Sequence, residues 1–427
     1  MLTIQSNSNF STCDGHSRRD FLKIGSLAMG GMSLPQLLQA SQNNPDASKD
    51  KAVIMIYLAG GPTHMDTFDL KDNAPLEFRG DFKSIPTAAK GVRICELLPK
   101  LASQMDQCSI IRSISDTVNS HSSFHVMTGQ TNKNQQPPGG WPSMGSVFSH
   151  KFGTQDGTPA YLDLGGGIKT GGFLGAANAG FSPSGKGKQD MQLNGITTDR
   201  FADRQKLLTC FDNLRRDVDN SGMVEGMDAF NQEAVNVITS NKLLTALEYG
   251  KEDQKTLDRY GKGGRNFLLA RRLVEAGARF VTLSVGGWDT HKDNFKAMRT
   301  RLPDLDNALG SLIEDLRERT MLDDVSVVTW GEFGRTPRIN SNAGRDHWSR
   351  VMSVHLAGGG MNNGQVIGAS DSKGGEPADR PVRLGEVFST LYKNCGIDSS
   401  TLVYQDLAGR PTALVDSSCK PIRELVG

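Results

Sequence analysis

Histidine and carboxylate side chains recur together in this sequence, next to segments that are otherwise apolar. The clearest stretch is VTLSVGGWDTHKDN, residues 281–294, in which an apolar run stops at two glycines and is followed by Asp289 and His291. Imidazole nitrogen and carboxylate oxygen are ligands of zinc and of hard divalent metals, and a catalytic site needs several of them with one position open. The stretch therefore favours a metal site, although an ordinary polar loop could have the same composition. Five of the eight histidines occur in such surroundings, namely His64, His121, His125, His291 and His347.

The apolar runs that precede these residues have the character of buried strands. They are continuous in hydrophobicity and closed by glycines, which is typical of strands covered on both faces. Helix-like segments lie between them, and one ends at Gly277, a typical residue just beyond a helix. This alternation predicts a doubly wound α/β fold in one large domain, with a mostly parallel sheet between two layers of helices. The expected strands are 51–61, 108–114, 278–287, 324–334 and 351–360, and the expected helices include 95–107, 266–278, 302–320 and 383–397.

The ends of these strands carry the candidate site residues, because ligands of open parallel sheets bind outside the carboxyl ends of the strands. Structural roles stay open for several of them. Asp289 and His291 could hydrogen-bond to each other within a loop, and Glu332 could pair with Arg335. His121 could instead cap a helix or lie in the core. The candidates are His64, Asp66, Asp69, Asp116, Ser120, His121, Ser122, Ser123, His125, Asp289, His291, Glu332 and Arg335, together with Asp346 and His347 directly before the fifth run.

The N-terminal segment 17–40, SRRDFLKIGSLAMGGMSLPQLLQA, has the features of an export signal. Paired arginines precede a moderately apolar stretch that falls short of the roughly 20 residues a membrane helix needs. The pattern is typical of the twin-arginine route, with the export machinery as a partner and the periplasm or cell envelope as the destination. We predict a signal peptide over 1–40, a linker over 41–50 and a domain over 51–427, with a helical excursion at about 194–261 and no stable transmembrane span.

Composition excludes several other classes of protein. The 48 basic and 47 acidic residues leave a formal charge of +1, which gives no indication of nucleic acid as a partner. The six cysteines form no CxxC pair, which argues against a zinc ribbon or a thioredoxin-type centre. A redox enzyme is disfavoured because we find no GxGxxG after a strand, no CxxCH and no iron–sulfur cysteine set. We interpret His150 and His355 as structural.

Several motifs, in one order along the chain, resemble a known family. They are LAGGPTHMDTFD, HSSFHVMTG, LLARRLVEAGARFV, GGWDTHKDN, WGEFGRTPR, GRDHW and GGGMNNGQVIGASD. With them the chain is similar to the twin-arginine-exported bacterial proteins catalogued as domain of unknown function 1501, over nearly everything after Lys51. That family belongs to the alkaline phosphatase and sulfatase clan.

The resemblance implies an alkaline-phosphatase-like core of three layers, α/β/α. It implies that Asp289 and His291 lie in the clan's Asp-and-His ligand segment and that His347 is its late histidine ligand. Glu332 would then occupy the metal-ligand region that follows another strand. The segment HSSFHVMTG is similar to the nucleophile helix of sulfatases, which also ends in Thr-Gly.

The chain also departs from the clan at two places. Relatives usually have one or two aspartates directly after the first strand, where this chain has Gly60 and Gly61, so that Asp66 would have to substitute. The sulfatase nucleophile motif, a cysteine or serine followed by x-Pro-x-Arg, is absent. An ungapped count back from Thr128 places Asn119 near the nucleophile's position.

The leading hypothesis is an exported, metal-dependent hydrolase of sulfate or phosphate esters of a small molecule or glycan. We expect Ser120 or Ser122 as nucleophile, unless a metal-activated water takes that role. Arg335 would bind the substrate anion, since a guanidinium binds such oxyanions with two hydrogen bonds. The expected ligands are Asp289, His291 and His347 for one divalent ion (zinc, calcium, magnesium or manganese), and Asp66, Glu332 and His121 for a second.

The competing hypothesis is a non-catalytic periplasmic binding or envelope protein on the same fold, which binds a glycan or a partner complex. The missing early aspartates and nucleophile motif favour it. The converging histidines and the export signal favour the hydrolase.

Overall fold

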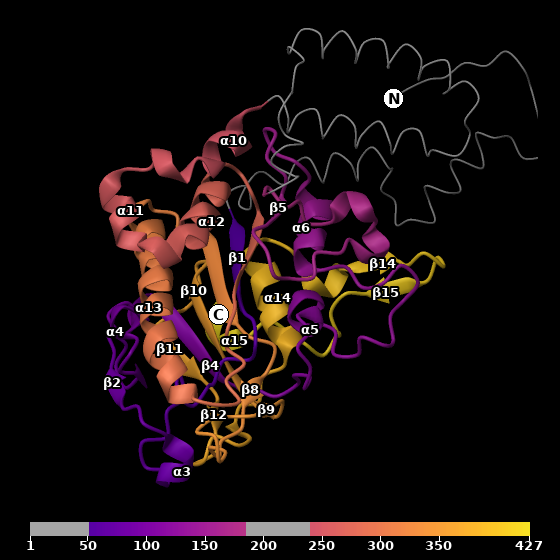
Figure 1. Ribbon diagram of the computed structural model, residues 1–427. Helices are drawn as coiled ribbons and strands as arrows, with labels where there is room; N and C mark the ends of the chain where they lie inside the picture. The colour runs from indigo at the N-terminus through magenta and orange to yellow at the C-terminus, as the bar shows by residue number, and fades with distance from the viewer. Residues whose placement is uncertain (1–50, 185–239) are drawn as a thin grey trace, which may run out of the picture. The chain divides into compact units, whose positions relative to one another are not determined.

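The computed structural model describes residues 51–184 and 240–427, which belong to one compact unit, Asp50–Gly427 (Figure 1). The predicted signal peptide, the linker at 41–50 and residues 194–239 of the predicted excursion lie outside the described residues. None of the helices in the described part combines the length and the hydrophobicity that crossing a bilayer requires.

A seven-stranded sheet in the order β11-β4-β10-β7-β1-β6-β5 forms the centre of this unit. Its pairs are parallel except for β10, which runs antiparallel to both β4 and β7. The predicted α/β fold with a mostly parallel sheet is therefore confirmed. The strands are β1 (Ala52–Leu58), β4 (Cys108–Ile114), β5 (Tyr161–Asp163), β6 (Phe280–Val285), β7 (Val325–Trp330), β10 (Met352–Gly358) and β11 (Gln365–Ile367).

Helices cover both faces of the sheet and make it a three-layer sandwich (Figure 1). On one face lie α12 (Arg265–Glu275) and α13 (Asn294–Glu318), whose apolar residues share a core with Ile54 of β1. On the other lie α6 (Met144–Phe152) and α14 (Leu384–Asn394), which share a core with Val53. Neighbouring residues of β1 thus belong to opposite cores, which explains why the strand is apolar throughout.

Two of the expected helices differ from their predicted bounds. Most of the segment 302–320 belongs to the longer α13, which begins at Asn294, contains Pro303 and ends at Glu318. The segment 95–107 holds only α4 (Pro99–Ala102) and a 3-10 turn, η1 (Met105–Gln107). Helix α4 begins at its proline, and the carboxylate of Asp306 in α13 accepts its first free N–H groups, at 2.9 and 2.8 Å.

The remaining elements are short. The two-stranded ribbons are β2 (Ser84–Pro86) with β3 (Arg93–Cys95), β8 (Gly334–Arg335) with β9 (His347–Trp348), β12 (Ala369–Ser370) with β13 (Pro377–Asp379), and β14 (Val403–Gln405) with β15 (Pro411–Ala413). The other helices are α3 (Leu76–Arg79), α5 (Phe124–Thr128), α10 (Lys242–Leu247), α11 (Gln254–Tyr260) and α15 (Arg423–Val426). The other 3-10 turns are η2 (Gly172–Leu174), η3 (Ala176–Asn178), η4 (Tyr249–Lys251), η5 (Lys262–Gly264) and η6 (Ser399–Thr401).

The direction of β10 decides which loops meet. Because β1, β4, β6 and β7 are parallel to one another, their carboxyl ends lie at the same edge of the sheet. Strand β10 runs the other way, so its amino end lies at that edge. Asp346 and His347, which precede β10, therefore meet the segments that follow the other four strands.

His355 of β10 is a buried histidine that generates a prediction about acid stability. It is 0% exposed, it stacks on Phe68 with ring centroids 5.5 Å apart, and neither ring nitrogen has a hydrogen-bond partner within the described residues. Burial lowers the pKa of His355 to about 4. The folded protein thus keeps the ring neutral where the unfolded chain, with an ordinary histidine pKa near 6.5, already binds a proton.

We therefore expect His355 to destabilise the fold as the pH decreases from about 6.5 to about 4. Between pH 7 and pH 5 this group should lower the free energy of unfolding by about 2 kcal/mol. The variant His355→Leu should lack this contribution. Its free energy of unfolding, measured by urea titration at pH 7 and at pH 5, should therefore change less with pH than that of the wild type. Equal pH dependence in the two proteins would contradict the assignment.

Candidate metal centre

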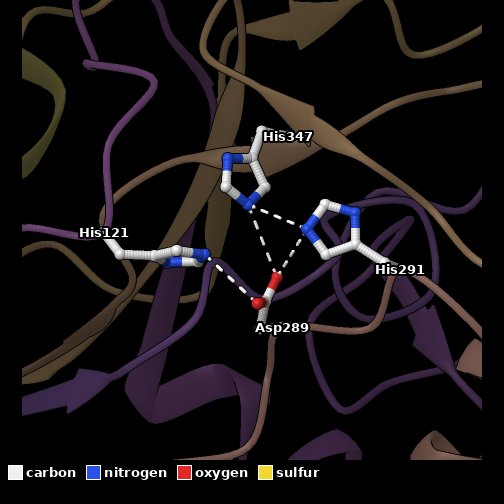
Figure 2. Close-up of side chains that lie close together, drawn as sticks. All are labelled: His121, Asp289, His291 and His347. Atoms are coloured by element: carbon white, nitrogen blue, oxygen red, sulfur yellow. Dashed lines mark hydrogen bonds and ion pairs between the residues drawn. The ribbon is translucent and has the colours of Figure 1, made fainter.

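Four side chains from three separate segments converge at the edge of the sheet described above: His121, Asp289, His291 and His347 (Figure 2). His121 follows β4, Asp289 and His291 follow β6, and His347 belongs to β9, just before β10. One ligand atom from each lies within 4.8 Å of those of the other three. In residues 51–184 and 240–427, this is the only group of three or more such side chains that could hold a metal ion.

The Asp289 carboxylate lies among the three rings (Figure 2). Its Oδ1 is 3.0 Å from His291 Nε2 and 3.4 Å from His347 Nε2, and its Oδ2 is 3.3 Å from His121 Nε2. The Nε2 atoms of His291 and His347 are 3.1 Å apart. Donor atoms that bind zinc at about 2.0–2.1 Å in a tetrahedron are about 3.3 Å from one another. The spacing therefore suits a shared ion of this kind, with His121 the most peripheral ligand.

The other ring nitrogen of each histidine faces an oxygen acceptor behind the cluster. A carboxylate or amide oxygen can only accept, so the Nδ1 atom that faces it carries the proton. In a neutral ring Nε2 then has a free lone pair, and in all three residues this atom points into the cluster. Such outer hydrogen bonds are typical of histidines that bind metal. The pairs are His121 with Glu332 (2.9 Å), His291 with Asp346 (2.6 Å) and His347 with Asn119 (3.0 Å).

When both rings are neutral and in these tautomers, His291 and His347 cannot hydrogen-bond to each other through Nε2. Two lone pairs that face each other at 3.1 Å are stabilised by a positive charge between them, which a metal ion or a proton supplies. Burial lowers the pKa of His347, and the charge of Arg335 adds to this effect, so a proton is disfavoured there. Three imidazoles and one carboxylate suit zinc and similar transition ions better than calcium or magnesium.

Arg335 fixes the position of Asp289 and does not face the cavity. It is 0% exposed, and its guanidinium donates to Asp289 Oδ1 (2.6 Å) and to the carbonyl groups of Gly60, Gly61 (2.8 Å) and Arg345 (3.1 Å). Burial raises the pKa of Asp289, but the hydrogen bond and charge of Arg335 outweigh this effect and lower it overall. The predicted contact of Arg335 with a substrate anion is thus corrected: it is a positioning residue.

Asp66, which the sequence suggested as a ligand, lies outside the cluster. It is fully buried, and its carboxylate accepts two hydrogen bonds from Arg345, at 2.7 and 3.1 Å. Thr63 and Asn294 donate to it as well, at 2.9 and 2.8 Å. These contacts use its oxygen atoms for a buried ion pair, so the role of Asp66 is structural.

Glu332 also lies behind the ligands. Its buried carboxylate accepts hydrogen bonds from the Gly60 N–H, at 2.9 and 3.2 Å, and from His121. His125 contacts the carbonyl oxygen of Glu332 and is likewise buried. Of the three residues expected around a second ion, Asp66 lies apart, Glu332 supports His121 from behind, and His121 joins the first group.

Two glycines allow the loops of the site to touch. A Cβ atom on Gly60, which has φ +117°, would lie 2.4 Å from the backbone nitrogen of Asp289. A Cβ atom on Gly344 would lie 2.0 Å from the carbonyl oxygen of His291. Gly60 therefore stands where relatives were expected to have an aspartate because the Asp289 loop occupies the space of a side chain.

A cavity of about 500 Å³ opens beside the cluster. Ser122 lines it, whereas Ser120 is not among the lining residues, so Ser122 is the better placed of the two candidate nucleophiles. Among the described residues no lysine or arginine lines this cavity. The lining includes Tyr57, His121, Ser122, Ser123, Asp289 and Glu332.

Sequence reasoning missed the partner of His347. Asn119 was noted only for its position relative to the sulfatase nucleophile, yet its side-chain oxygen holds the His347 ring. The available sequence signal was the position of Asn119, which lies two residues before His121 in the loop that follows β4. Asp346 was a candidate next to His347, and it turns to His291 instead.

Comparison with known proteins gives a family and a distant structural similarity. The model of the family described as "Protein of unknown function (DUF1501)" matches residues 50–426. No curated protein matches the sequence significantly.

Three solved structures illustrate the structural similarity. The crystal structure of Ps i-CgsB is 12% identical, covers 81% of this chain and 72% of its own, and has a TM-score of 0.39. The PsFucS1 sulfatase from Pseudoalteromonas sp. is 12% identical over 89% and 72% of the two chains, with a TM-score of 0.36. The lipoteichoic acid synthase LtaP from Listeria monocytogenes is 13% identical over 83% and 75%, also with a TM-score of 0.36.

The hydrogen bond from His291 to Asp346 generates a prediction about cation binding. Loss of this acceptor frees the ring to rotate and to change tautomer, so Asp346→Ala should weaken Zn²⁺ binding about 10- to 100-fold. Competition with a chromophoric zinc chelator measures the change. The matched control is Asp81→Ala, which removes an exposed carboxylate whose one ion-pair partner in the described part of the chain is Arg299. Equal affinities in both variants would contradict the role of Asp346.

Proposed function

The chain belongs to the DUF1501 family, and we propose that it is a metal-dependent hydrolase of sulfate or phosphate esters. The observation that carries the proposal is the convergence of three histidine Nε2 atoms and one carboxylate beside a cavity (Figure 2). Lone pairs directed at one point are the property of a site built to bind a cation.

His121, Asp289, His291 and His347 would hold the ion. Bound there, a divalent ion supplies positive charge next to the cavity, where negative charge develops on a phosphoryl or sulfuryl oxygen. The described cavity lining offers no lysine or arginine for this purpose. Binding of the anionic ester should therefore depend on the same four residues as the reaction.

The surrounding residues hold the ligands in place before a substrate arrives. Arg335 fixes Asp289, Glu332 fixes His121 and Asp346 fixes His291. Because these supports are hydrogen-bonded and two of them are buried, little reorganisation is needed on binding.

Ser122 is the proposed nucleophile. Its Oγ accepts a hydrogen bond from the Phe124 N–H at 3.3 Å, which leaves its own proton available for transfer. The hydroxyl lies next to His121 in sequence and lines the cavity beside the cluster.

Export is a further part of the proposal. The paired arginines Arg18 and Arg19 and the apolar stretch after them support the twin-arginine route to the periplasm or cell envelope. Fractionation of cells that produce the full chain tests it, and protein found only in the cytoplasm would oppose it.

One observation favours the alternative, a non-catalytic binding or envelope protein. Sites that bind sulfate or phosphate groups usually offer arginine or lysine, and the cavity lining described above has neither. On this alternative the cation would serve binding or stability alone.

Kinetic measurements distinguish the two functions. With aryl sulfates and aryl phosphates as substrates, His347→Ala should lose both bound metal and activity. Ser122→Ala should keep the metal and lose activity at least 100-fold, as expected for a nucleophile. Ser120→Ala is the matched control and should keep both. A wild-type protein that binds metal but hydrolyses neither class of ester would favour the alternative.

A further inference from the structure

A second hollow, a groove of about 700 Å³, is lined by Asp346 and Trp348, the two sequence neighbours of the ligand His347. Asp346 connects the groove with the ligand cluster: it lines the groove, and its Oδ1 holds the ring of the ligand His291 at 2.6 Å. Trp348, which directly follows the ligand His347, lines the groove as well. A molecule bound here would therefore lie close to the cluster without displacing any of its ligands.

The groove is lined by two aromatic rings, and each has a cationic side chain over one face: Arg350 over Trp348 and Lys373 over Phe78. The indole N–H of Trp348 donates to the carbonyl oxygen of Gly375 at 2.6 Å, which holds the half-buried ring in one orientation. Phe78 lines the same groove and is also half-buried. Rigid aromatic rings of this kind pack against apolar faces at low cost in conformational entropy, and the C–H face of a sugar ring is such a face.

The groove also offers a positive charge without a partner. Arg338 is exposed and lines the groove, and within the described residues its guanidinium forms no ion pair or hydrogen bond. By contrast, Arg350 beside Trp348 is paired with Glu376. A guanidinium with free N–H groups is suited to two hydrogen bonds with a sulfate, phosphate or carboxylate group.

The two hollows differ in the chemistry they offer. The cavity beside the cluster has serine hydroxyls, the Tyr57 ring and no lysine or arginine among its described lining, whereas the groove combines the rings of Phe78 and Trp348 with Arg338, which has no ion pair within the described residues. We propose that the groove binds a ring of an anionic saccharide, with the sugar face on Trp348 and an anionic substituent on Arg338. The further claim that this ring belongs to the substrate rests on the proposed function, since it requires the reacting ester to lie at the cluster.

Binding measurements with the full-length protein test this proposal. The probes are dextran sulfate, chondroitin sulfate and alginate, with uncharged dextran and free inorganic sulfate as comparisons. The wild-type protein should bind at least one of the anionic polymers more tightly than dextran and than free sulfate. Trp348→Ala and Arg338→Ala should each weaken that binding about tenfold or more, and Arg338→Ala should also reduce its dependence on salt.

Two control variants distinguish the loss of contacts in the groove from a general effect of substitution on the protein. Trp348→Phe should retain most of the affinity because it keeps an aromatic face. Trp141→Ala, which removes a half-buried tryptophan that contacts Phe173, should bind as the wild type does. No binding to any of the anionic polymers, or equal binding by Trp348→Ala and the wild type, would overturn the proposal. Binding of free sulfate as tight as that of the polymers would overturn the saccharide part of it.

One variant distinguishes this proposal from the proposed function. Asp289→Asn alters the cluster and does not line the groove. It should lose hydrolytic activity and keep the part of the polymer affinity that depends on Trp348 and Arg338. If the wild-type protein binds the saccharide but has no esterase activity, the result supports saccharide binding in the groove and contradicts the proposed hydrolase function.

Discussion

A buried arginine sets the geometry on which the site depends. The guanidinium of Arg335 is removed from water, and a charge in the interior is tolerated only when its donors are satisfied and an opposite charge is near. Its partners are Asp289 and three carbonyl groups, from the loop after β1 and from the segment before β10. The hydrogen bonds of the Arg335 guanidinium therefore bring three loops together and orient Asp289, the central ligand. Its removal would leave Asp289 free to move and three carbonyl groups without their donor.

The same division between ligand and support holds for the histidines. Each ring is held through Nδ1 by an oxygen that can only accept, so the tautomer is fixed and Nε2 is left to the cluster. The supports come from different strands than the rings they hold: Glu332 follows β7, and Asn119 follows β4. The residues that form and support the candidate cation site are thus distributed over most of one sheet edge, while the groove beside it has a different chemistry and lies outside the ligand set.

Much of this arrangement could be predicted from sequence, because strand ends are visible as breaks in hydrophobicity. The apolar runs identified the five central strands, and the polar residues beside them contained all four members of the cluster. The direction of β10 was not predictable from its composition, although it explains why His347, which precedes its strand, meets residues that follow theirs. Asp66 and Arg345 are 279 positions apart, and no local pattern indicates that they form a buried pair. Likewise a sequence shows that Arg335 is near the site but not that its guanidinium is buried.

The most direct test is X-ray diffraction from crystals grown with Zn²⁺, with data collected at the zinc absorption edge. The account predicts one anomalous peak at about 2.0–2.2 Å from the Nε2 atoms of His291 and His347 and from a carboxylate oxygen of Asp289, with His121 as the fourth ligand. Crystals that show no peak there, with the two Nε2 atoms still in contact, would contradict the central claim that this cluster is built to hold a cation.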